Sequence, residues 1–147
     1  MASEATTVVI PRVRQNYVAI LVAAVASFLL EAGWYSAFYA TWTNGIGRTN
    51  DWLMANSPNR GLQFGTALVA AGLLAASISC VTQLTGAQTA WRGMKTGVLL
   101  WFGVVVTTWA TEYMFEVRPI GLWMVNLGYW LVGMVMMGAI VGAWKKK

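Results

Sequence analysis

The feature that most limits the fold of this chain is the placement of its charges, which leaves four long stretches almost free of them. These stretches cover residues 15–47, 61–91, 96–111 and 119–144, and the only charged side chain within them is Glu31. A helix of about 20 apolar residues crosses a bilayer core about 30 Å thick. Each stretch therefore accommodates one membrane span, with the outer end of the third reaching Glu112.

The sequence predicts an all-α fold, a four-helix transmembrane bundle with both termini in the cytoplasm. Helices are expected because backbone groups in lipid must find their hydrogen-bond partners within the segment. Runs such as residues 67–76 also lack the alternation of a barrel strand. The predicted spans are 17–39, 61–84, 93–113 and 122–144, which form one membrane domain at 17–144 between a polar tail at 1–16 and a basic tail at 145–147.

The connections between the spans are expected to be simple. Residues 41–60 form the only long loop, since Gly, Asn and Pro residues interrupt it, and short turns are expected at 85–92 and 115–121. Arg12 and Arg14 before an apolar run are typical of a signal peptide. Because the apolar run continues well past the small residues at 24–26, we expect the first helix to be retained.

Composition excludes several classes of function. Hydrophobic residues make up 58% of the 147 residues and charged residues 10%, against about 25% charged in a soluble domain. The net charge of +5 does not indicate nucleic-acid binding, since the Lys and Arg residues lie at the ends of apolar runs. With no His and only Cys80, the chain lacks His-ligated zinc, His-bound haem and a Ser/His/Asp triad. We therefore expect no metal site, no cofactor and no catalytic residues, and the eight Met are more typical of gap filling in a core than of a metal pathway.

Positive charges predict the orientation. Seven Lys and Arg residues, at 12, 14, 92, 95 and 145–147, belong to the side that holds both termini and the loop between the second and third spans. Three, at 48, 60 and 118, belong to the other side. Because the side richer in Lys and Arg is usually cytoplasmic, both termini are expected inside, in the inner membrane of a cell.

Small residues indicate how the helices pack. Ala71 and Ala75 in the second span, and Gly138 and Gly142 in the fourth, recur at four-residue spacing, which permits close approach of helices in lipid. Two interpretations are open: these faces pack within one bundle, or they form the seam of a homodimer.

Glu31 is the most informative single residue. It lies about 21 Å along the first helix at 1.5 Å per residue, and a carboxylate at such depth costs about 2–3 kcal/mol on insertion scales. The third helix runs in the same direction and brings Glu112 and Glu116 to the outer interface, where Arg118 follows. A polar cluster is therefore predicted at the outer face, consisting of Glu31, Glu112, Glu116, Arg118 and Asn126, with Trp34, Tyr35 and Trp109 as aromatic neighbours.

This cluster has three interpretations. It is a network that fixes helix register, a site for protons or a substrate, or a contact with a partner subunit. No nucleophile and no cofactor motif accompanies it.

Four segments carry a resemblance to a known family: residues 31–36 (EAGWYS), 115–119 (FEVRP), 125–129 (VNLGY) and 138–144 (GAIVGAW). Together they resemble the DUF1761 family of small bacterial membrane proteins, over residues 15–144. The resemblance implies four spans and a bacterial membrane, and it implies no activity. The family pattern often has a histidine after the Gly-Tyr pair, where this chain has Trp130.

Three functions follow as hypotheses. The first is a non-enzymatic membrane component, either a homo-oligomer or an accessory subunit whose partners are the lipid bilayer and other membrane protein subunits. The second is a small proton-coupled transporter that uses Glu31. The third is a membrane enzyme, or a protein that binds a lipid or small molecule, built on the carboxylate cluster in the outer leaflet.

Overall fold

The computed structural model describes residues 12–146, and all regular structure in that part of the chain is helical. The helices are α1 (Tyr17–Ala37), α2 (Tyr39–Ile46), α3 (Asn50–Asn56), α4 (Arg60–Leu84), α5 (Ala90–Leu100), the π-helix η1 (Trp101–Val106), α6 (Thr107–Phe115) and α7 (Ile120–Ala143). Most of the predicted polar tail at 1–16, and the last residue of the predicted basic tail at 145–147, lie outside the described residues.

Four helical segments within residues 12–146 are long and apolar enough to cross a membrane: α1, α4, the continuous run from α5 through η1 to α6, and α7. This finding confirms the predicted all-helical fold with four candidate spans. The largest difference in position is in the third span, which was expected to begin at 93 and begins at Ala90, where the Thr89 side chain accepts a hydrogen bond from the Arg92 N–H at 3.2 Å and caps the helix.

The prediction of a long loop at 41–60 was wrong, because α2 and α3 occupy most of it. Thr49 caps α3 by accepting a hydrogen bond from the Trp52 N–H at 3.2 Å. Gly47 ends α2 with a φ of 65°, a conformation that favours glycine. Gly45, expected to interrupt a helix, lies inside α2, where a Cβ would come within 2.6 Å of the Leu122 Cβ of α7. Tertiary packing therefore accounts for this glycine.

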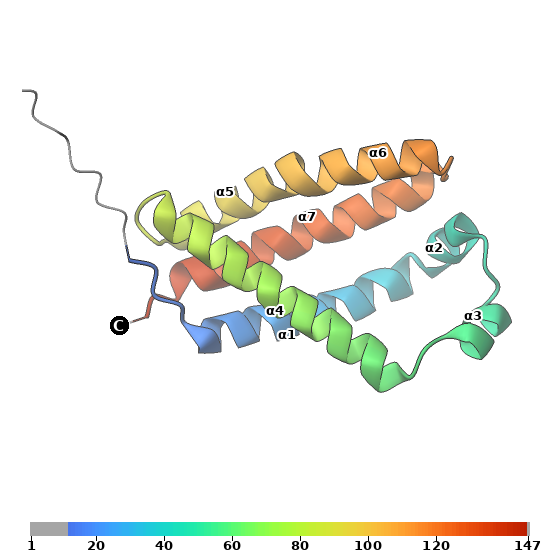
Figure 1. Cartoon of the computed structure of the whole chain (residues 1–147), viewed down its shortest axis with the longest axis horizontal. Helices are drawn as coiled ribbons and strands as arrows, with labels where there is room; N and C mark the ends of the chain where they lie inside the picture. Colours follow the sequence, from blue (N-terminus) through green and yellow to red (C-terminus); the bar gives the residue numbers. More distant parts are fainter. Residues whose placement is uncertain (1–11, 147) are drawn as a thin grey trace, which may run out of the picture.

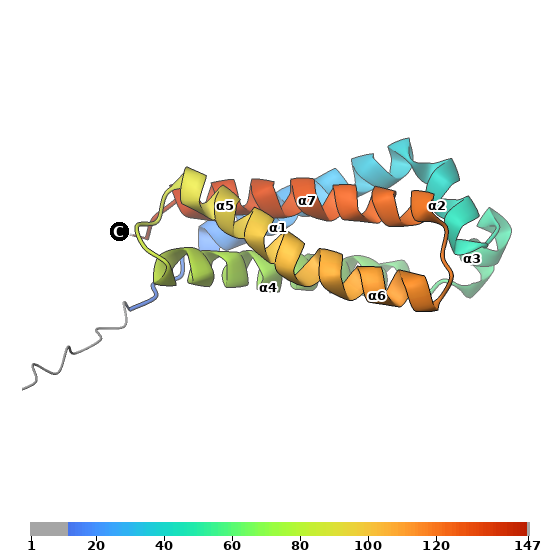
Figure 2. The ribbon, with the colours of Figure 1, turned by 90° about the horizontal axis from the view of Figure 1, so that it is seen from above.

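The four long segments run along one axis with alternating direction (Figures 1 and 2). The two ends of the described chain lie at the same end of the bundle as the turn between α4 and α5 (Figure 1). The helices α2 and α3, together with the turn between α6 and α7, form the opposite end. The turn that contains Glu116 and Arg118 therefore lies at the end of the bundle opposite to the two ends of the described chain.

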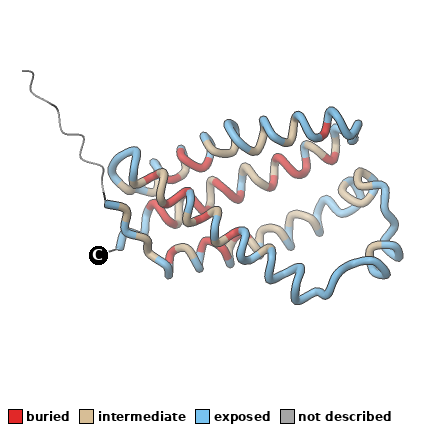
Figure 3. The backbone as a smooth tube through the Cα atoms, viewed as in Figure 1, coloured by how far each residue is buried: buried red, intermediate tan, exposed pale blue. Residues whose placement is uncertain are grey.

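The core lies where α7 meets its neighbours, and α7 carries more buried residues than any other helix (Figure 3). A cluster of apolar side chains fills the space between α1, α4 and α7, including Ala23, Ala75, Ile78 and Met137. The outward faces carry large exposed apolar side chains such as Leu21, which suits acyl chains as solvent.

Candidate functional site

Glu31 lies in the second half of α1 and faces α7. The hydroxyl of Tyr129 on α7 lies 3.4 Å from the Glu31 Oε2 and donates to it. The same hydroxyl lies 3.3 Å from the Oγ of Ser27, one turn earlier on α1. Tyr129 is buried and Glu31 is partly exposed, so the carboxylate has one face against the bundle and one face open.

A second set of hydrogen bonds continues toward the outer end. The Tyr35 hydroxyl donates to the Asn126 Oδ1 at 2.7 Å, and the Asn126 Nδ2 donates to the Tyr113 hydroxyl at 2.5 Å. Asn126 is buried, with 6% of its surface exposed, so both ends of its amide are used where water is scarce. The rings of Tyr35 and Tyr129 lie 5.5 Å apart between centroids, which places the two sets side by side.

The three aromatic residues expected around Glu31 make different contacts. The Trp34 Nε1 donates to the Val125 carbonyl oxygen at 3.0 Å and fastens α1 to α7. Trp109 stacks on Tyr113 with 5.7 Å between ring centroids. Only Tyr35 lies beside Glu31 and also takes part in the hydrogen bonding, which makes it the link between the carboxylate and Asn126.

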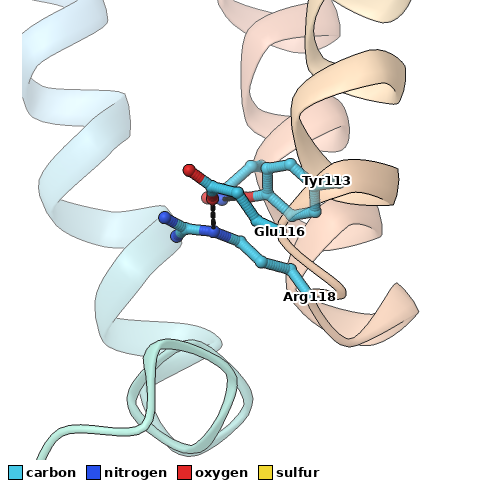
Figure 4. Close-up of polar contacts among 4 residues, drawn as sticks. Tyr113, Glu116 and Arg118 are labelled. Carbon is cyan, nitrogen blue, oxygen red and sulfur yellow. Dashed lines mark hydrogen bonds and ion pairs between the residues drawn. The ribbon is translucent and has the colours of Figure 1, made fainter.

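The turn after α6 holds an exposed ion pair. The Arg118 Nε donates to the Glu116 Oε2, and the guanidinium lies over the ring of Tyr113, 5.6 Å from its centroid (Figure 4). The hydrogen bond to Glu116 raises the pKa of Arg118 above its already high ordinary value. The arginine therefore stays charged at every physiological pH, and its half of the pair is not a pH sensor.

The structure thus divides the predicted cluster into two parts. Glu31 and Asn126 lie at the junction of α1 and α7, whereas Glu116 and Arg118 pair with each other at the surface, and Glu112 is exposed on α6. Tyr113 joins the parts, since it accepts from Asn126 and lies beneath Arg118. The functional role of these residues stays a prediction.

Tyr113 and Tyr129 were not predicted as polar members of the site, although Tyr35 was expected as an aromatic neighbour of Glu31. Tyr129 was named only as part of the segment 125–129 that resembles the family. A helical spacing of three residues between Asn126 and Tyr129 places both on the same face of α7. From that spacing, Tyr129 could have been predicted as a polar neighbour of Asn126.

A cavity of about 710 Å³ lies on the open side of Glu31, between the second half of α1 and the first half of α4. Its lining includes Phe28, Glu31, Tyr35, Trp42, Gln63 and Phe64. Phe28 and Phe64 meet edge to face with 5.6 Å between centroids, which joins the two helices at one edge of the cavity. The sequence did not predict this space, because it depends on the angle at which α4 departs from α1.

The four residues proposed for helix packing are all buried within the single chain. Ala71 and Ala75 of α4 belong to the core shared with α1 and α7. A Cβ on Gly138 would overlap the Gly93 carbonyl oxygen of α5, and one on Gly142 would overlap the Thr89 carbonyl oxygen. These four small residues therefore pack against other helices of the same chain.

Comparison with known proteins gives a single family. Neither the curated proteins nor the solved structures provide a match to this chain. The model of the family described as protein of unknown function (DUF1761) matches residues 18–142, which is most of the chain. The resemblance seen in the sequence motifs is thereby confirmed, and the chain belongs to the DUF1761 family.

Proposed function

We propose that this protein binds an amphiphilic organic cation within the membrane, in the cavity between α1 and α4, with Glu31 as the counter-charge. The observation that carries the proposal is the position of Glu31. Its carboxylate belongs to α1, a candidate membrane span, and lies on the wall of a cavity lined by aromatic side chains. An ionisable residue within a span marks a functional site by default, because its burial is costly unless something compensates.

The surroundings of Glu31 do not supply that compensation. Within residues 12–146 the only ion pair is the one between Arg118 and Glu116. Among the described residues the Glu31 carboxylate accepts one hydrogen bond, from Tyr129, and at 3.4 Å it is long. A positively charged ligand would provide the missing partner.

The cavity walls favour a cation whose charge is attached to an apolar body. Aromatic rings attract cations through their faces, and Phe28, Tyr35, Trp42 and Phe64 contribute four of them. The volume of about 710 Å³ lies within the range of about 300–1,000 Å³ that is typical of small-molecule sites. Leu62 and Phe64 at the rim are exposed apolar side chains of a spanning helix, so we infer that the ligand enters from the bilayer.

Binding of tritiated tetraphenylphosphonium to the full chain in nanodiscs tests the proposal. The wild-type protein should bind the cation saturably. Glu31→Gln should weaken binding at least about tenfold, since it removes the opposite charge from a site of low dielectric. Glutamine retains the shape of glutamate and still accepts from Tyr129, so the variant should fold.

Glu112→Gln is the matched control, because it removes the same charge from an exposed position outside the cavity lining. It should leave the dissociation constant within about twofold. Equal affinities for the wild-type protein and Glu31→Gln would remove Glu31 from the site and contradict the proposal.

Proton-coupled transport through the same cavity is the second candidate. The Tyr129 hydroxyl between Ser27 and Glu31 favours it, since it connects the carboxylate to a polar group one turn closer to the opposite face. In proteoliposomes, transport predicts that a pH gradient accumulates the cation, whereas a binding protein gives the same uptake with and without the gradient.

We also propose that the protein lies in a bacterial inner membrane with both termini in the cytoplasm. Seven Lys and Arg residues on the side of the termini against three on the other side support this orientation. The cavity beside Glu31 would then belong to the outer half of the bilayer.

Assembly into a homo-oligomer, or with other subunits as an accessory protein, remains a further part of the proposal. It rests on the small number of spans. A seam between copies would have to use residues other than Ala71, Ala75, Gly138 and Gly142, which pack within the chain. Native mass spectrometry from the membrane supports assembly if the mass exceeds the 16.0 kDa of one chain and contradicts it if only single chains are released.

A further inference from the structure

A second cavity, of about 360 Å³, lies at the end of the bundle where both ends of the described chain meet. It is lined by Arg12, Val13, Arg14, Gln15, Tyr17 and Lys146. Three of these six residues are cations, and they come from opposite ends of the sequence. The fold therefore gathers this charge, which no local run of basic residues explains.

Hydrogen bonds hold the segment that carries the two arginines in place. The backbone N–H of Arg14 donates to the Gln83 Oε1 of α4 at 2.9 Å. The Asn16 side chain caps α1, and its Nδ2 donates to the Trp144 carbonyl oxygen at 3.2 Å, just after the end of α7. The residues before α1 are thus tied to α4 and to the end of α7, which keeps the three cations near one another.

No acidic side chain neutralises these cations within residues 12–146. The carboxylates there are Glu31, Asp51, Glu112 and Glu116, which belong to the second half of α1, to α3 and to the far end of the third span. In the described part of the chain the only ion pair joins Glu116 to Arg118. The cavity consequently has a positive charge that attracts an anion.

The level of the cavity relative to the membrane indicates which kind of anion it binds. Tyr17 is the first residue of α1, a candidate span, and it is 74% exposed. The Lys146 Nζ lies 5.6 Å from the centroid of this ring. Tyrosine at the end of a span marks the layer where acyl chains give way to headgroups, and the anions of that layer are lipid phosphates.

We propose that this cavity binds the phosphate headgroup of an anionic phospholipid, with Arg12, Arg14 and Lys146 as its cationic contacts and Tyr17 against the start of the acyl chains. The site is separate from the cavity beside Glu31. Either proposal stands if the other fails.

Native mass spectrometry of the full chain tests the assignment, after reconstitution in equal amounts of phosphatidylglycerol and phosphatidylcholine. The wild-type protein should retain phosphatidylglycerol in preference to phosphatidylcholine. Arg12→Gln combined with Lys146→Gln should weaken phosphatidylglycerol binding at least about tenfold, because each cation near an anionic lipid contributes separately.

The matched control combines Arg92→Gln with Lys95→Gln. It removes two positive charges from the same end of the bundle, outside the cavity lining, and should keep the preference for phosphatidylglycerol. Circular dichroism of both double variants verifies that the helices persist.

Equal loss in the two double variants would show attraction to positive charge in general and would overturn the site. Equal retention of the two lipids by the wild-type protein would overturn it as well. Displacement of the bound anion by inorganic phosphate alone, without retention of phosphatidylglycerol, would assign the cavity to a soluble phosphate and contradict the lipid proposal.

Discussion

At the scale of single residues, Asn126 organises the outer half of the bundle. Its amide accepts from Tyr35 of α1 and donates to Tyr113 of α6, so one side chain of α7 joins two other helices. Within a membrane such hydrogen bonds contribute modestly, about 0.6 kcal/mol each on average. Their value here is geometric, because they position Tyr35 next to Glu31 on the wall of the larger cavity.

Asn126→Leu should lower the free energy of unfolding by about 1–2 kcal/mol, since two hydrogen bonds are lost and two tyrosine hydroxyls are left without their partner. Thermal unfolding of the purified protein in detergent measures the change. Asn44→Leu, at an exposed position of α2, is the control and should stay within about 0.5 kcal/mol of the wild type. A comparable loss in both variants would contradict the role assigned to Asn126.

At the scale of helices, α5 and α7 make the most extensive contact in the bundle. A Cβ on Gly93 or Gly138 would overlap the carbonyl oxygen of the other residue, and a Cβ on Gly97 would overlap that of Met134. Backbone meets backbone along this line, as is common where small residues let membrane helices approach. The third span therefore packs closely against α7 because glycines on both helices leave room for the backbones to approach.

Gly138→Ala should lower the free energy of unfolding by about 1–3 kcal/mol, because the added methyl group pushes α5 away from α7. Gly72→Ala makes the same chemical change on α4 at a position where the Cβ meets nothing within 4 Å. It should be neutral or stabilising by up to about 1 kcal/mol, since alanine favours the helix. Unfolding in a denaturing detergent compares the two, and an equal effect would rule out the close contact.

The sequence was sufficient for the spans and insufficient for the elements between them. The long uncharged stretches predict four helices, because lipid leaves the backbone no other partners. Gly45 and Asn50 were interpreted as helix breakers, yet both lie in short helices. In α2, Gly45 packs against the distant residue Leu122, whereas α3 begins at a local cap made by Thr49. The π-helix at Trp101–Val106 was likewise not predicted, because its one glycine, Gly103, does not by itself indicate a π-helix.

The site was predictable to a similar extent. The isolation of Glu31 in an apolar stretch indicated an important position, and the depth of Asn126 matched it. The separation of Glu116 and Arg118 from Glu31 was not predictable, since it depends on how α6 and α7 turn about their axes. The cavity depends on the divergence of α1 and α4, a tertiary property that spacing along the chain does not encode.

At the scale of the whole molecule, the alternating helices give the two ends opposite surroundings. One end brings together Arg12, Arg14 and Lys146, and the other holds α2, α3 and the turn with Glu116 and Arg118. If the first end is cytoplasmic, the basic cavity faces the inner leaflet, and the cavity beside Glu31 opens in the outer half of the bilayer.

Labelling with a membrane-impermeant maleimide tests this orientation in a Cys80→Ala background, which removes the only cysteine. Ser57→Cys, between α3 and α4, should react in intact spheroplasts. Ala87→Cys, in the turn between α4 and α5, should react only after permeabilisation, because it lies at the end predicted to be cytoplasmic. The reverse pattern would invert the topology.

A groove on the third span can be compared with the cavity beside Glu31. This groove, of about 470 Å³, is lined by apolar side chains such as Val98 and Phe102 and contains Lys95, with no carboxylate. Its size and apolar character resemble those of the cavity beside Glu31, but its charge is opposite. An organic cation should therefore distinguish between the two sites.

Photolabelling with an azido-substituted aryl phosphonium, followed by peptide mapping, locates the bound cation directly. The account predicts adducts on Phe28–Tyr35 of α1 and Leu62–Ala67 of α4, abolished by excess tetraphenylphosphonium and by Glu31→Gln. Adducts spread over the lipid-facing helices, including the groove beside Lys95, and insensitive to the competitor would contradict it.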